Sequence, residues 1–122
     1  MMEIVAALYF KVANDDPNVP EWTDRDRIIW SDEHKAPARY LGLGMAGYYP
    51  LEDLVTLRKL DSRQGHPRRL KLPGVEVSSG SLGQGLSIAV GMAIAAKIEG
   101  KNIPCSASWA TASSRKAAFG KP

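Results

Sequence analysis

The feature that most constrains the fold is a long helical pattern made mostly of small residues. A segment rich in glycine and serine, Ser78 to Gly85, opens this pattern, and we expect the helix itself over Leu82 to Ile98. Its small residues are Gly83, Gly85, Ser87, Ala89, Gly91, Ala93 and Ala95. Glycine inside a helix costs roughly 1 kcal/mol relative to alanine. The helix is therefore expected to lie close to another backbone or to a ligand.

The remaining chain alternates helical and strand-like patterns. Ile4, Leu8 and Val12 recur every fourth position, which is typical of an amphipathic helix. The patterns predict helices over residues 3–13, 37–45 and 51–60, a strand over 27–30, an irregular loop over 61–75 and a short extended piece over 75–77. Residues 103–122 show neither period, and we expect them to be poorly ordered. Together the patterns indicate an α/β chain.

Size and composition exclude several classes of protein. A length of 122 residues, 44% of them hydrophobic and 24% charged, suits one small globular domain. No run of 18 uncharged apolar residues occurs, and the N-terminus carries Glu3 and no cleavage site for a secretory signal. The single cysteine, Cys105, leaves neither an internal disulfide nor a closed thiolate metal site. We expect a cytoplasmic protein that has no contact with a membrane.

Basic residues gather in one stretch, although the net charge is only +3. The stretch contains Arg58, Lys59, Arg63, Arg68, Arg69 and Lys71. It fits a solvated loop, and a phosphate or nucleic acid site is the alternative. Neither zinc-finger spacing nor an aromatic RNA-binding motif accompanies it. We therefore expect no nucleic acid partner.

Three features carry candidate chemistry. His34 follows the predicted strand, and His66 lies between Gly65 and Pro67, which restrict its backbone. The segment from Gly80 to Gly85 leads into the long helix, where exposed N–H groups at a helix start suit an anion or the polar edge of a ring. Each feature also has an ordinary structural explanation: a surface histidine in the first two cases, a close helix contact in the third.

In combination, these features resemble a known family. From Glu3 to Asn102, about four fifths of the chain is similar to the N-terminal region of transketolases, particularly to the N-terminal subunits of two-chain transketolases. The matching segments are EIVAALYFKV, DRDRIIWSDEHKAPARYLGLGMAGYYP, LRKLDSRQGHP and LPGVEVSSGSLGQGLSIAVGMAIAAK. The resemblance implies a domain over residues 1–102 with part of a thiamine diphosphate-binding α/β fold, in which helices flank a parallel sheet.

The same resemblance implies a function and its residues. Transketolases use thiamine diphosphate, with a divalent metal such as Mg²⁺, to transfer two-carbon ketol units between sugar phosphates. His34 matches a histidine near cofactor and substrate, and His66 matches one that contacts the hydroxyl end of the substrate. Gly80 and Leu82 match the loop against the aminopyrimidine ring. The implied partners are a sugar-phosphate substrate and either a C-terminal subunit or a second copy of the chain.

The chain also departs from the family pattern. The family has glycine where this chain has Glu33, and a histidine motif expected before the first helix is absent. After Asn102 the family continues into a buried strand and a Gly-Asp-Gly-Glu motif whose aspartate binds the metal, whereas residues 103–122 contain no carboxylate side chain. One permitted reading of the codons from Pro104 onward, in a shifted frame, gives that motif, and our hypothesis is that the chain is truncated and frameshifted after about residue 102. We therefore predict an aberrant, disordered tail over residues 103–122 and assign no metal ligand in the chain.

These departures leave alternatives open. The first is a transketolase-like N-terminal fragment that is inactive on its own. The second is a non-catalytic module that pairs with transketolase subunits. Deoxyxylulose phosphate synthase and ketoacid dehydrogenases are neighbouring families, but the QGHP and GSLGQG segments favour transketolase.

Overall fold

Two parallel strands form the centre of the structure, a computed structural model that describes residues 2–31, 35–62, 72–78 and 83–108. Strand β1 (Arg27–Trp30) pairs with β2 (Cys105–Ser108), with Arg27 opposite Cys105 and Trp30 opposite Ser108. Isoleucine and tryptophan in β1 favour a half-buried pleated surface. Both strands therefore end at the same edge of the sheet. The expected α/β class with a parallel sheet is confirmed.

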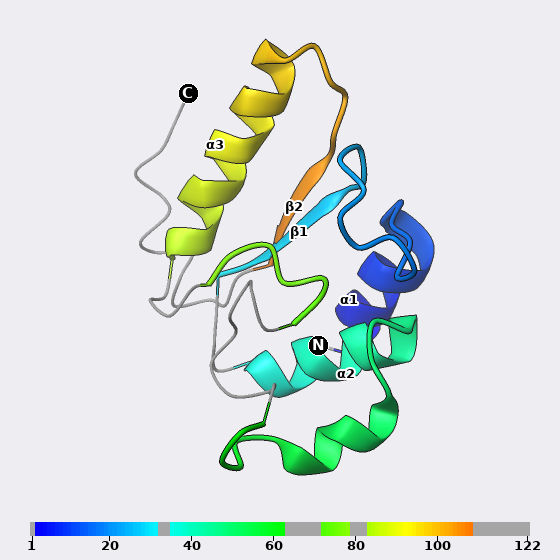
Figure 1. The fold of residues 1–122 in the computed structure, drawn as a ribbon. Coiled ribbons are helices and arrows are strands. Elements are labelled where there is room, and N and C mark those ends of the chain that lie inside the picture. The colour runs from blue at the N-terminus through cyan, green and yellow to red at the C-terminus, as the bar shows by residue number, and fades with distance from the viewer. Residues whose placement is uncertain (1, 32–34, 63–71, 79–82, 109–122) are drawn as a thin grey trace.

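Helices cover both faces of this strand pair (Figure 1). The chain begins with α1 (Met2–Ala7) and the π-helical turn η1 (Leu8–Val12), and α2 (Ala36–Ala46) packs against both. Helix α3 (Gln84–Ile98) packs on β1 and β2 from the other side. Ile28 and Trp30 belong to the core under α1 and α2, whereas the alternation of a strand turns the buried Ile29 to the opposite face.

Most predicted elements are present, but two segments have a different secondary structure from the one predicted. The helix expected over residues 51–60 is the shorter 3-10 helix η3 (Leu51–Thr56), none of whose residues is fully buried. The segment 103–122, expected to lack regular structure, contributes β2 over Cys105–Ser108, so that expectation is wrong for these four residues. The domain boundary at residue 102 stays a prediction, and residues 109–122 lie outside the described part.

Local sequence explains where α2 begins and ends. Pro37 occupies its first turn, where the absent N–H is not needed. Gly47 ends the helix in the left-handed conformation, with φ of 97°. The N–H groups of Gly47 and Tyr48 donate to the carbonyls of Gly44 and Leu43 at 3.1 and 3.0 Å. This arrangement satisfies carbonyls that the last turn would otherwise leave without donors.

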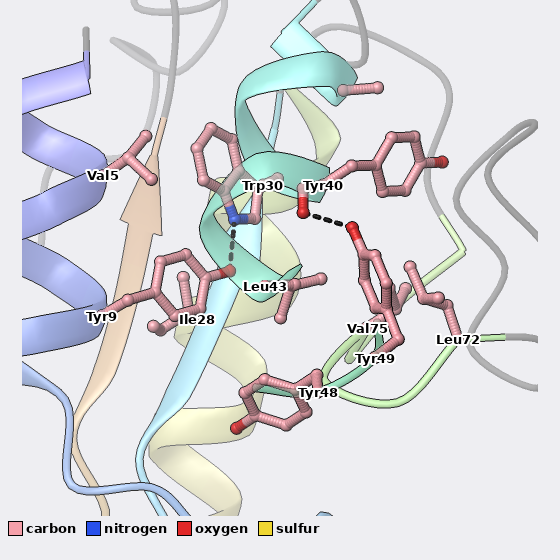
Figure 2. Close-up of a cluster of buried hydrophobic side chains, with 11 residues drawn as sticks. Val5, Tyr9, Ile28, Trp30, Tyr40, Leu43, Tyr48, Tyr49, Leu72 and Val75 are labelled. Atoms are coloured by element: carbon pink, nitrogen blue, oxygen red, sulfur yellow. Dashed lines mark hydrogen bonds between the residues drawn. The ribbon is translucent and has the colours of Figure 1, made fainter. Parts of the chain in front are cut away.

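Aromatic residues with satisfied polar groups fill the core between β1 and the first two helices (Figure 2). The indole Nε1 of Trp30 donates to the Tyr9 hydroxyl at 3.3 Å, and the Tyr49 hydroxyl donates to the Tyr40 carbonyl. Burial raises the pKa of Tyr9 above its usual value. The phenol consequently stays protonated near neutral pH, and the buried cluster carries no phenolate charge.

A glycine in α2 sets how closely the first helix can approach. A Cβ added to Gly42 would lie 2.6 Å from Cγ1 of Val5, whereas one added to Gly91 in α3 would meet nothing within 4 Å. Replacing glycine by alanine within a helix brings the same propensity gain at both positions. We expect Gly42→Ala to be less stable than Gly91→Ala by about 1–3 kcal/mol, the usual cost of overpacking. Urea unfolding of the two variants measures this difference, and equal stabilities would contradict the packing seen here.

Candidate functional site

The candidate site lies at the edge where both parallel strands end. Ser31 follows β1 directly and is only 2% exposed. The Gly83 N–H donates to the Ser31 carbonyl at 3.3 Å, and the Gly85 N–H donates to the Ser31 hydroxyl at 3.1 Å. We call Ser31, Gly83 and Gly85 the β1–α3 junction. It joins the end of a strand to the start of a helix that lies more than fifty residues later in the chain.

Both glycines of the junction are needed for this geometry. Gly83 has a φ of 91°, a left-handed conformation that side chains rarely adopt. A Cβ on Gly85 would lie 2.6 Å from Cβ and 2.7 Å from Cα of Ser31. The close approach predicted for the small-residue helix is therefore confirmed at Gly85, with a packed neighbour as its cause. At Gly91 no atom of the described residues lies within 4 Å of an added Cβ, so the close approach does not extend to this position within the chain.

The four predicted site residues lie outside the described residues. They are His34, His66, Gly80 and Leu82. The sequence nevertheless connects three of them to the junction, since His34 is three residues after Ser31 and both Gly80 and Leu82 fall in the segment that runs into Gly83. His66 falls between Ser62 and the buried Leu72. In the basic stretch, Arg63, Arg68, Arg69 and Lys71 are likewise outside the described part.

An ionic cluster lies at the opposite end of β1. Arg25 and Arg27 both pair with Glu76, whose side chain is 7% exposed. The Arg25 Nε also donates to the Pro20 carbonyl at 2.7 Å, and the Arg27 Nη2 donates to the Thr23 carbonyl at 3.0 Å. A groove of about 980 Å³ opens beside the cluster. Acceptors within the protein already bind both guanidinium groups. The cluster therefore anchors the segment around Glu76, which precedes Gly83 in the chain, to β1.

The structure adds two observations on ligands and membranes. Within residues 2–31, 35–62, 72–78 and 83–108, no three His, Cys, Asp or Glu side chains are grouped so that they could hold a metal ion. In the same ranges, every helix is too short or too polar to span a membrane.

Sequence reasoning missed Ser31 and Glu76. Ser31 stood out only as the first residue of the segment that leads to His34, and Glu76 as part of a short extended piece. Both act through burial beside partners far away in the sequence, at Gly85 and Arg25 respectively. A serine at a strand end, or an acid between two valines, carries no local sign of such partners.

Removing the negative charge of Glu76 should destabilise the chain. Glu76→Gln leaves two largely buried guanidinium groups without a counter-charge, and we expect a loss of about 2–4 kcal/mol in the free energy of unfolding. Glu99→Gln is the control, because the Glu99 side chain is 64% exposed and its pair with Lys101 is 3.6 Å long. That variant should change stability by less than about 0.5 kcal/mol. Urea denaturation of both variants tests this, and a similar effect in the two would contradict the structural role of Glu76.

Comparisons with known proteins give a consistent result. Residues 1–104 match the family model described as "Transketolase, thiamine diphosphate binding domain". The chain is 42% identical over 98 residues to the 6-deoxy-6-sulfo-D-fructose transketolase subunit SqwG of Clostridium sp. (strain MSTE9), covering 80% of this chain and 36% of that protein. It is 47% identical over 100 residues to a subunit of the apulose-4-phosphate transketolase of Actinobacillus succinogenes, covering 81% and 36%.

Among solved structures, transketolase from Leishmania mexicana superimposes with a TM-score of 0.71 at 43% identity. That match covers 77% of this chain and 14% of the other. The chain thus spans about a third of the length of the two relatives that are subunits, and a smaller share of the solved enzyme.

Proposed function

Because the chain belongs to the transketolase family through its thiamine diphosphate-binding domain, we propose that it forms part of the cofactor site of an enzyme that transfers two-carbon ketol units between sugar phosphates. The match over residues 1–104 carries this proposal and confirms the resemblance noted from Glu3 to Asn102. The junction supports it, since ligands in open α/β sheets bind beyond the carboxyl ends of the strands. A cytoplasmic location is part of the proposal.

The described start of α3 does not offer its Gly83 and Gly85 N–H groups to a diphosphate. The N–H groups of Gly83 and Gly85 are already bound to Ser31, so these two donors of the helix start are not available to an anion. We place Gly80 and Leu82, in the segment just before, against the aminopyrimidine ring. Glycine at position 80 allows the backbone to approach an aromatic face closely.

Two imidazoles would handle protons and charge in this site. Thiamine diphosphate would supply, when bound, a thiazolium ring with an acidic, nucleophilic carbon, and this ring would accept the electron pair of a breaking carbon–carbon bond. We place His34 near cofactor and substrate and His66 at the hydroxyl end of the substrate. There an imidazole exchanges protons near neutral pH and stabilises developing alkoxide charge. A divalent cation such as Mg²⁺ would accompany the diphosphate, because it neutralises the charge and binds hard oxygen ligands.

A partner subunit is the second part of the proposal. Helix α3 exposes Val90, Ile94 and Ile98 by 51%, 53% and 81%. These positions repeat every fourth residue and form one stripe, which we call the α3 outer stripe. Two of the similar proteins are named as transketolase subunits. A C-terminal subunit, or a second copy of the chain, that covers this stripe would remove apolar surface from water.

The same stripe supports a second candidate function. An apolar helix face can mark a protein interaction site even when no reaction takes place there. The chain would then be a non-catalytic module that pairs with transketolase subunits. Turnover separates the two candidates, because only the first requires His34 and His66 to act on a sugar phosphate.

The turnover experiment uses a ketose phosphate, an aldose phosphate, thiamine diphosphate and Mg²⁺, with and without a transketolase C-terminal subunit. We expect no turnover by the chain alone, because the site is proposed to form between subunits and residues 103–122 offer no carboxylate side chain for the metal. Turnover with the added subunit requires that subunit to supply the metal ligand. His66→Ala should then lower kcat/KM by about 10²–10⁴-fold, as for loss of a proton-transferring side chain. Glu99→Gln, on the exposed end of α3, should not change it.

Two results would overturn parts of this proposal. Robust turnover by the chain alone would remove the requirement for a partner. A complex with the subunit that binds but never turns over would leave only the non-catalytic candidate.

The outer stripe gives a separate prediction. Ile94→Glu puts a charge where a partner would bury an apolar side chain, so we expect the affinity for the C-terminal subunit to fall at least about tenfold. Ile94 is half exposed, so the melting temperature of the chain alone should hardly change. Analytical ultracentrifugation of the mixture measures this affinity, with Glu52→Gln, a change of an exposed side chain on η3 and not on α3, as the control. Unchanged association of Ile94→Glu would place the partner elsewhere.

A further inference from the structure

Ser31 directs both of its acceptors to the same short stretch of chain. Its carbonyl binds the Gly83 N–H and its hydroxyl binds the Gly85 N–H. In an exposed residue at the end of a strand, water could satisfy the carbonyl and the hydroxyl, and no bond to a distant segment would be required. At 2% exposure, water has little access to Ser31, and the two bonds hold the helix start from one point.

Close packing prevents the start of α3 from moving nearer to Ser31. An added Cβ on Gly85 would lie within 3 Å of Cβ, Cα and N of Ser31, so the backbones already touch. The hydrogen bonds prevent the helix start from moving away, and the contact prevents it from moving nearer. Because packed interiors have little free volume, such a contact resists even small displacements.

We infer that Ser31 is a positioning residue that fixes the start of α3 against the end of β1, and with it the points from which the chain continues to His34 and arrives from Leu82. The chain leaves Ser31 toward His34 after three residues and enters Gly83 directly from Leu82. The spacing of these two departure points is therefore fixed by the junction. The inference rests on the proposed function only where it connects this spacing to the binding of thiamine diphosphate.

The consequence for the cofactor follows from geometry. A ring held between a glycine loop and an imidazole tolerates little change in the gap, and displacements near 1 Å can cost about 10²-fold in rate in positioned active sites. Ser31 touches neither cofactor nor substrate in this proposal. Its effect passes through the distance between the end of β1 and the start of α3.

The experiment compares Ser31→Ala with Tyr49→Phe in the full chain. Both variants remove one hydroxyl that makes a buried hydrogen bond, but Tyr49 binds the Tyr40 carbonyl in the aromatic core, away from the junction. Amide hydrogen exchange, followed by NMR, reports on the Gly83 and Gly85 N–H groups. Titration calorimetry with thiamine diphosphate and Mg²⁺, in the presence of the C-terminal subunit, reports cofactor affinity.

In Ser31→Ala we expect the amides of both Gly85 and Gly83 to exchange at least tenfold faster, and the Kd for thiamine diphosphate to rise at least tenfold. Gly83 is the informative amide, because its acceptor is the backbone carbonyl of Ser31, which alanine retains. Faster exchange there means that the helix start has moved. Tyr49→Phe should change the exchange rates of the two amides and the Kd by less than twofold, even if it lowers the melting temperature as much as Ser31→Ala does.

A second variant keeps the test decisive. Gly85→Ala retains every hydrogen-bonding group but forces the backbones apart, so it should weaken cofactor binding as Ser31→Ala does. The inference is overturned if Gly83 exchange is unchanged in Ser31→Ala, or if Tyr49→Phe and Ser31→Ala lose affinity alike. If the unmodified complex does not bind thiamine diphosphate, the proposed function fails, and Gly83 exchange still decides whether Ser31 positions the helix.

Discussion

The structure depends on β1, a strand of four residues that is in contact with neighbours on both faces. Its side chains alternate between the aromatic core under α2 and the face covered by α3, and one of its edges pairs with β2. A strand of this length has little stability of its own. It is held because Trp30 and Ile29, adjacent in sequence, are buried on opposite faces. A shift of one residue would turn the Trp30 side chain from the aromatic core toward the face that α3 packs against, so the present register is favoured.

Polar groups fix the two ends of the same strand. At its amino end, Glu76 ties Arg25 and Arg27 to the segment that precedes the junction. At its carboxyl end, Ser31 receives the start of α3. The chain from Glu76 to Gly83 is therefore attached at both of its ends to residues in or beside β1. Whatever conformation the Gly80–Leu82 segment takes with a ligand, its two ends are set by contacts made elsewhere.

The sequence pattern predicts those helices and strands whose formation depends on residues close together in the chain. The periodicity of residues 3–13 and the proline and glycine at the ends of α2 located both helices, and β-branched and aromatic residues located β1. Strand β2 was missed because Cys105 to Ser108 have no strand pattern and pair, among the described residues, with the distant strand β1. At the site, the resemblance supplied His34, His66, Gly80 and Leu82, whose roles stay predictions. Ser31 needed the structure, since burial against Gly85 leaves no mark in sequence.

Helix α3 shows how such a domain can combine a fixed site with a surface for another subunit. Its side toward the sheet uses Gly85, Ala89 and Ala96, small residues that let backbones approach closely. Its other side carries the larger outer stripe, which the described residues leave exposed. A helix that is apolar on all sides is typical of the interior of a larger assembly. Because the small residues of α3 already pack on the sheet, a partner that binds the stripe would add packing on a side of the helix that the junction does not use.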